Sequence, residues 1–279
     1  MEAERNEDTP AVIESWRFVQ QMLADLTATV IDDAADDREL REGLRMLAKV
    51  TALCTELSVE ADPQRPHFFD MCTDTRMVGG PNPDGRYLLA MIRGDHCYRI
   101  TGQRGTTTYL GFQVLAGTGL TPRRMAGYLS DTALQCTQGS FALVLAATDP
   151  GADALGGAQW IPIPEDASAV VVREYIADAA AETPASMTVQ CLDPPPLRPV
   201  TDTEAAAAFT AMAWTIVKLA TLHRTIKPEL LTQPNSLVTA AAAELGGADT
   251  TPDNLYMLGS FALDTDESLL LQFLSLIPL

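Results

Sequence analysis

Basic residues are scarce in this sequence, which has 19 Lys and Arg against 37 Asp and Glu and a formal net charge of -18. A surface of this sign repels phosphate backbones and anionic lipid headgroups, so we expect neither a nucleic-acid partner nor a membrane partner. No uncharged stretch reaches the roughly 18 residues that a membrane-spanning helix requires. The acidic first residues lack the basic-then-apolar order of a signal peptide. The sequence therefore predicts an acidic, soluble, intracellular protein.

Cysteines are few, and their spacing does not suggest pairing. No two of the five form a Cys-x-x-Cys pair, and an odd number cannot be fully satisfied by internal disulfides. We therefore expect a reducing, cytoplasmic location. The five residues are Cys54, Cys72, Cys97, Cys136 and Cys191.

Histidine is scarcer still, and none of the three lies at ligand spacing from another His or a Cys. We therefore expect no metal and no other cofactor. His96 follows Gly94-Asp95 and is interpreted as a solvated turn residue. His223 is interpreted as a residue that complements the dipole at the end of a helix. The third histidine is His67.

Motifs of the common catalytic folds are also missing. The pentapeptide Gly-x-Ser-x-Gly, which contains the nucleophile of many serine hydrolases, is absent. The glycine-rich stretches Gly102-Gln-Arg-Gly105 and Gly117-Thr-Gly119 lie between predicted strands, not at strand-to-helix junctions. They therefore indicate hairpin turns rather than phosphate loops. The sequence assigns no catalytic residue.

What the sequence does contain is enough apolar character for a sizeable core, with 47% hydrophobic residues over 279 positions. Residues 11–31 carry apolar side chains at three- and four-residue spacing, and residues 38–57 repeat the pattern. The acidic stretch from Asp32 to Asp37 separates the two. We predict an N-terminal helical hairpin over residues 1–60.

The period changes to two in the segment 61–196. Leu110, Phe112 and Val114 alternate with polar or small residues, as strands do. Gly, Pro and Asp turns separate several such runs, without helical crossovers between them. This pattern predicts an antiparallel β-sandwich or jelly-roll-like domain. Trp160-Ile-Pro-Ile-Pro164 is too rich in proline for a central strand and indicates a sheet edge or a bend.

The three prolines of residues 194–196 form a stiff boundary before a predicted helical segment, 197–248. An N-cap signal at Thr201 predicts a long helix from about Glu204 to Thr225. A shorter helical piece is predicted from about Ser236 to Leu245.

Residues 249–279 are predicted to begin a second, truncated β unit. The evidence is an internal similarity, because Pro83-Asp84-x-x-Tyr87 recurs as Pro252-Asp253-x-x-Tyr256. The overall fold class is therefore α+β, with an N-terminal helical hairpin, an antiparallel β-sandwich and a long helix in the C-terminal half.

A distributed set of polar residues has the best claim to a site. Arg173 and Tyr175 share one face of a predicted strand, and Glu174 takes the other. Buried charge in a strand usually needs a partner, so Arg173 is predicted to pair with Asp84, either as a structural clasp or as an anion-recognising pocket. The candidate binding or structural residues are Asp84, Tyr87, Gln113, Arg173, Glu174, Tyr175, Asp253 and Tyr256.

Several segments, in this order along residues 80–279, resemble a bacterial family built on domain of unknown function 1214. They are Asn82-Pro-Asp84-Gly-Arg-Tyr87, Tyr98-Arg-Ile-Thr-Gly102, Tyr109-Leu-Gly-Phe-Gln-Val114, Trp160-Ile-Pro-Ile-Pro164, Val172-Arg-Glu-Tyr175 and Pro252-Asp-Asn-Leu-Tyr256. The resemblance implies a jelly-roll-like β domain and no established reaction or ligand. In that family further strands follow the second Pro-Asp-x-x-Tyr element, whereas this sequence ends at Leu279, so we expect a shortened member.

Two functions follow as hypotheses. The first is a protein that binds a small molecule or a protein partner without chemistry of its own, because no nucleophile-base pairing is evident. The alternative is an enzyme that uses Asp84, Tyr87, Arg173 and Glu174 for acid-base chemistry on a small organic substrate. The apolar end of the chain adds a possible homo-oligomer through a C-terminal strand.

Overall fold

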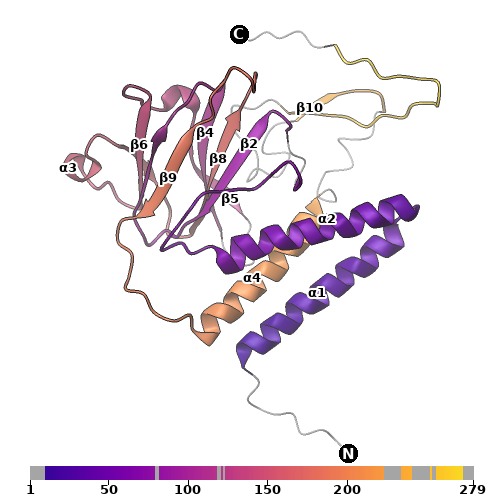
Figure 1. The fold of residues 1–279 in the computed structure, drawn as a ribbon, viewed down its shortest axis with the longest axis horizontal. Helices are drawn as coiled ribbons and strands as arrows, with labels where there is room; N and C mark the ends of the chain where they lie inside the picture. Colours follow the sequence, from indigo (N-terminus) through magenta and orange to yellow (C-terminus); the bar gives the residue numbers. More distant parts are fainter. Residues whose placement is uncertain are drawn as a thin grey trace, which may run out of the picture. The chain divides into compact units, whose positions relative to one another are not determined.

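The protein has a mixed α+β fold, seen in a computed structural model that describes residues 10–78, 82–117, 121, 123–222, 234–240, 252 and 256–272 (Figure 1). The chain divides into two compact units, residues 1–223 and residues 224–279. No helix of the described residues is long and apolar enough to cross a membrane.

Three long helices of the first unit come from the two ends of its sequence, and a short helix lies between strands. They are α1 (Ala11–Asp33), α2 (Asp37–Thr55), which continues into a π-helical turn (Glu56–Glu60), the short α3 (Ala152–Leu155) and α4 (Asp202–Ala220). Asp36 starts α2 by accepting hydrogen bonds from the backbone N–H groups of Arg38 and Glu39. Thr201 and Glu204 form a capping box that starts α4. Helix α4 packs against α1 and α2, which lie at the other end of the unit's sequence.

A five-stranded antiparallel sheet forms the centre of the unit. Its order is β1 (Phe69–Asp70), β2 (Gly85–Met91), β8 (Ala167–Tyr175), β4 (Tyr109–Ala116) and β5 (Arg124–Leu129). Strand β8 is central, and its residues Ala167–Arg173 and Glu174 are all buried. A strand covered on both faces reads as a continuous apolar run, which explains the Val-Val-Val sequence there.

A four-stranded sheet lies beside the first. Its order is β7 (Gln159–Pro162), β6 (Ser140–Ala146), β3 (Tyr98–Gln103) and β9 (Ser186–Cys191). One pair departs from the predicted antiparallel pattern, because β6 and β7 are parallel. The connection between them contains α3, and such a crossover returns the chain to run in the same direction. The proline-rich β7 lies at the sheet edge, as predicted.

Two apolar clusters hold these layers together. One joins the facing sides of the two sheets and includes Phe112, Val172, Ile100 and Leu143. The other joins the opposite side of the five-stranded sheet to α1, α2 and α4. Alternate residues of β8 serve the two clusters, so consecutive side chains of this strand face different surroundings.

The second unit contains an antiparallel pair, β10 (Val238–Ala240) and β11 (Tyr256–Leu258). The helix predicted from Ser236 to Leu245 is therefore wrong at 238–240. Val238 and Thr239 are β-branched, and cross-strand pairing with β11 overrides the helical signal of the alanines that follow. Asp253, His223 and the apolar C-terminal residues 273–279 lie outside the described residues.

Candidate functional site

Polar side chains gather on the helix-facing side of the five-stranded sheet, at the end where β8 finishes. Arg173 and Tyr175 lie on that side and Glu174 lies on the other, as the sequence predicted. Cross-strand register sets Arg173 opposite Tyr87, Tyr175 opposite Tyr109, and Gln113 opposite Tyr128. We call these six residues the Tyr/Arg cluster: Tyr87, Tyr109, Gln113, Tyr128, Arg173 and Tyr175.

Contacts within the Tyr/Arg cluster run across four neighbouring strands. The guanidinium carbon of Arg173 lies 6.0 Å from the ring centroid of Tyr87, at the outer limit of a cation–π contact. The rings of Tyr109 and Tyr175 stack with centroids 5.2 Å apart and an interplanar angle of 26°. The hydroxyls of Tyr109 and Tyr128 are hydrogen-bonded to each other. These contacts hold the rings in defined positions.

Two glycines make room for the rings. A Cβ atom at Gly111 would lie 2.4 Å from the Tyr109 hydroxyl oxygen, and one at Gly85 would lie 2.8 Å from that of Tyr87. Each glycine is two residues from its tyrosine, on the same face of the same strand. The rings therefore lie along their strands, over the glycines.

Burial keeps the Tyr/Arg cluster partly shielded from water. Arg173 is 7% exposed and Gln113 is 1% exposed. Burial raises the pKa of Tyr87 to about 12; Tyr175 adds to this rise, while Arg173 opposes it. Tyr87 is therefore a neutral hydrogen-bonding group at neutral pH.

Glu174 belongs to a different environment from its neighbour Arg173. It is 2% exposed, and its Oε1 accepts hydrogen bonds from the Thr107 hydroxyl (2.8 Å) and the backbone N–H of Ala185 (2.6 Å). Its Oε2 lies 3.5 Å from the guanidinium of Arg86. These partners fix the carboxylate in the structure, on the side of the sheet away from the Tyr/Arg cluster.

Asp84 does not make the predicted pair with Arg173. Its side chain is exposed, and no ion pair joins these two described residues. Asp84 lies just before β2, where its backbone carbonyl accepts a hydrogen bond from Ile176 (2.9 Å). The Asn82-Pro-Asp84-Gly-Arg-Tyr87 motif therefore contributes a main-chain contact at the start of β2. Tyr256 lies on β11 of the second unit, and Asp253 is outside the described residues.

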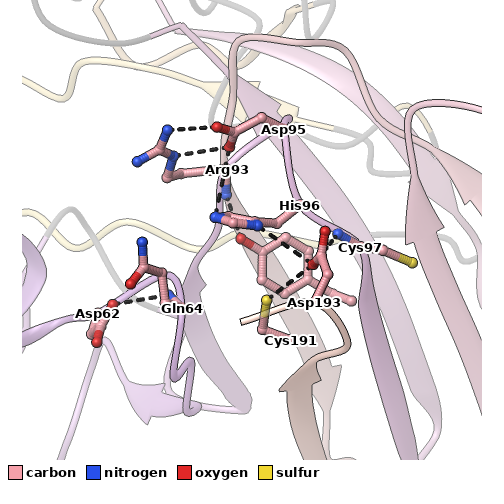
Figure 2. A network of polar contacts seen from close by, with 9 residues as sticks. Asp62, Gln64, Arg93, Asp95, His96, Cys97, Cys191 and Asp193 are labelled. Atoms are coloured by element: carbon pink, nitrogen blue, oxygen red, sulfur yellow. Dashed lines mark hydrogen bonds and ion pairs between the residues drawn. The ribbon is translucent and has the colours of Figure 1, made fainter. Parts of the chain in front are cut away.

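A second polar group lies at the start of β3 and the end of β9 (Figure 2). The Nδ1 atom of His96 lies 3.4 Å from Oδ1 of Asp193. The same oxygen accepts hydrogen bonds from the Cys191 thiol (3.3 Å) and from the backbone N–H of Cys97 (3.1 Å). The His96 side chain is only 13% exposed, so the prediction of a solvated turn residue is wrong.

No protein-family model and no curated protein matches the chain. Among solved structures, it is similar to an uncharacterised protein from Burkholderia cenocepacia, with a TM-score of 0.74 and 26% identity. The match covers 86% of this chain and 67% of that one. A match to the VPA0106 protein from Vibrio parahaemolyticus has a TM-score of 0.30 and 15% identity, and covers 41% of this chain and 32% of that one.

Sequence reasoning missed Tyr109, Tyr128, Cys191 and Asp193 as site residues. A signal for Tyr109 was present, because it begins a strand and lies two residues before a glycine. For the last two, the spacing Cys191-x-Asp193 places two potential ligands together, but the histidine that joins them is distant in the sequence.

Proposed function

We propose that this protein binds a small organic anion, without covalent chemistry, at the Tyr/Arg cluster. The observation that carries the proposal is the array of hydrogen-bonding groups on one sheet face. One nearly buried guanidinium, one amide and four phenols lie across four adjacent strands. A planar carboxylate on an organic ring is the class of ligand that these groups fit.

The chemistry of the groups supports this ligand class. A guanidinium binds a carboxylate through two parallel hydrogen bonds, and such charge-assisted bonds are stronger than neutral ones. Reduced exposure to water strengthens the electrostatic attraction further. Stacked tyrosines offer flat apolar surface for the rest of the ligand, with hydroxyls at its edge.

Binding is favoured over acid-base catalysis because of what the Tyr/Arg cluster consists of. Its six described residues include no carboxylate, imidazole or thiol, and the pKa of Tyr87, raised to about 12, makes this phenol a poor acid at neutral pH. The two acids of the alternative hypothesis lie elsewhere: Glu174 is held on the other face by Thr107 and Ala185, and Asp84 is exposed.

Thermal shift and calorimetric titration of the whole chain against a panel of aromatic and aliphatic carboxylates test the proposal. We expect aromatic carboxylates to raise the melting temperature by preferential binding to the folded state. Arg173→Gln should weaken binding by about 10- to 100-fold, since a hydrogen bond to a charged group contributes about 1.5–3 kcal/mol.

Arg124→Gln is the matched control, because Arg124 is an exposed arginine paired with Asp166. It should leave the affinity unchanged. A panel without any binder would overturn the proposal, as would equal loss of affinity in Arg124→Gln and Arg173→Gln.

We further propose that the chain is a member of the domain of unknown function 1214 family, is of bacterial origin, and has a jelly-roll-like β-sandwich. Support comes from the motif order and from the shared core of its two sheets. A cytoplasmic location is part of the same proposal, supported by five free thiols. Assembly through the C-terminal strand concerns residues 273–279 and stays a prediction.

A further inference from the structure

Three potential metal ligands converge away from the Tyr/Arg cluster. His96 comes from the turn between β2 and β3, and Cys191 and Asp193 come from the end of β9 and the segment after it. One ligand atom from each residue lies within 4.8 Å of the other two. The register explains this meeting, because Cys191 pairs with Tyr98, two residues after His96.

The spacing of these atoms fits tetrahedral coordination. Zinc binds imidazole nitrogen and carboxylate oxygen at about 2.0–2.2 Å and thiolate sulfur at about 2.3 Å, so neighbouring ligand atoms lie roughly 3.3–3.8 Å apart. His96 Nδ1 is 3.4 Å from Asp193 Oδ1, and Cys191 Sγ is 3.3 Å from the same oxygen. The third pair, the Cys191 sulfur and the His96 ring nitrogen, lies within 4.8 Å, so side-chain rotation can bring these two atoms into the same range.

His96 supplies an independent observation. Its Nδ1 atom is buried and makes no hydrogen bond in the described part of the chain. A buried ring nitrogen without a hydrogen bond is costly, and a coordinated cation would satisfy it.

A carboxylate lies near the other nitrogen of the imidazole, beyond hydrogen-bond distance. Its Nε2 faces Asp95 Oδ1 at 4.0 Å, and Arg93 holds that carboxylate through two contacts of 2.9 and 2.6 Å. A carboxylate that accepts this ring N–H orients a metal-ligating histidine and adds to the affinity of the site, so we expect the 4.0 Å gap to shorten when zinc binds. Figure 2 shows His96 between Asp95 and Asp193.

We propose that His96 Nδ1, Cys191 Sγ and a carboxylate oxygen of Asp193 form a zinc site, with water as the fourth ligand. The mixed nitrogen, sulfur and oxygen set suits zinc rather than magnesium or calcium, which prefer oxygen ligands alone. As the zinc–sulfur bond forms, the Cys191 thiol releases its proton to solvent. The ion ties the turn before β3 to the segment after β9.

Metal titration of the chelator-treated full chain tests this site. We expect one Zn²⁺ per chain in competition with a chromophoric chelator, and one Co²⁺ with thiolate-to-metal charge-transfer absorption in the near ultraviolet. Cys191→Ser should abolish that absorption. Asp193→Asn and His96→Gln should each weaken zinc binding by more than the roughly 10- to 100-fold typical of an outer-shell change.

Asp95→Asn should give a loss within that outer-shell range. Cys97→Ser and His67→Gln are the controls and should leave both metals bound, because the Cys97 sulfur points away from the site (Figure 2). Circular dichroism checks the fold of every variant, and Asp193, whose side chain is 53% exposed, is the substitution least able to disturb it. No stoichiometric binding, or charge-transfer absorption that survives Cys191→Ser, would overturn the proposal.

Discussion

Arg173 and Glu174 are consecutive, oppositely charged and almost equally buried, yet the two faces of β8 treat them differently. Glu174 faces the space between the sheets, where two hydrogen-bond donors and Arg86 meet its carboxylate. Arg173 faces the other way and lies over the ring of Tyr87, among phenols and an amide. One strand therefore presents an anion held by short hydrogen bonds on one face and a cation beside aromatic rings on the other.

The difference shows that burial alone does not identify a functional charge. Thr107, which donates to Glu174, itself accepts a hydrogen bond from Arg104, so the carboxylate lies at the centre of a connected structural network. The surroundings of Arg173 include the aromatic ring of Tyr87, which can also contact a planar ligand. Stability should therefore depend on Glu174, and ligand affinity on Arg173.

The largest expected effect is that of Glu174→Ala on the free energy of unfolding. Removing one member of a buried ionic network leaves its partners unpaired and costs about 3 to 5 kcal/mol. The partners here are Thr107, the N–H of Ala185 and Arg86. Urea unfolding followed by circular dichroism measures the loss.

Arg173→Gln is the comparison variant for that experiment. We expect it to cost less than Glu174→Ala, because glutamine keeps a polar side chain beside the Tyr87 ring, while it weakens ligand binding as described above. Equal destabilisation by the two variants would contradict the proposal that Glu174 has the structural role and Arg173 the ligand-binding role.

A pH experiment gives the next largest effect and isolates Tyr87. Its phenol has a pKa raised from 10.0 to about 12 in the folded protein, mainly by burial. Between these values the unfolded chain has lost this proton and the folded chain retains it, so stability falls as pH rises and is fully present below pH 10. Because Tyr87 is only half-buried, we expect a loss on the order of 2 kcal/mol.

Tyr87→Phe is the reference for this measurement, because other groups also titrate at high pH. Unfolding free energies of the two proteins should converge or cross between pH 10 and 12. If their difference does not change over that interval, the environment of Tyr87 is not the one described.

The local sequence pattern predicted which segments form strands better than it predicted which strands contact one another. Alternation and turn residues located β8 and the opposite directions of Arg173 and Glu174, because side-chain direction follows directly from strand geometry. The order of strands in the sheet does not follow from such local patterns. Strand β8 pairs with β2 and with β4, although β3 to β7 lie between β2 and β8 in the sequence. The meeting of Tyr87, Tyr109 and Tyr175 depends on that order.

Two of the wrong predictions have the same physical origin. The pair of Asp84 with Arg173 was inferred from charge alone, whereas the exposed side chain and the aromatic surroundings are consequences of tertiary packing. His96 was interpreted from its turn position, but β9 brings Cys191 and Asp193 beside it. Both depend on contacts between residues distant in the sequence.

Tyr128→Phe is expected to give the smallest effect and tests how the Tyr/Arg cluster is held. It removes one hydroxyl of the pair formed with Tyr109 and leaves the ring in place. The loss in unfolding free energy should be about 1 kcal/mol, as for one hydrogen bond. Ligand affinity should fall less than in Arg173→Gln, since no charge is removed. An affinity loss as large as that of Arg173→Gln would show that the tyrosine hydroxyls contribute as much to ligand binding as the guanidinium does.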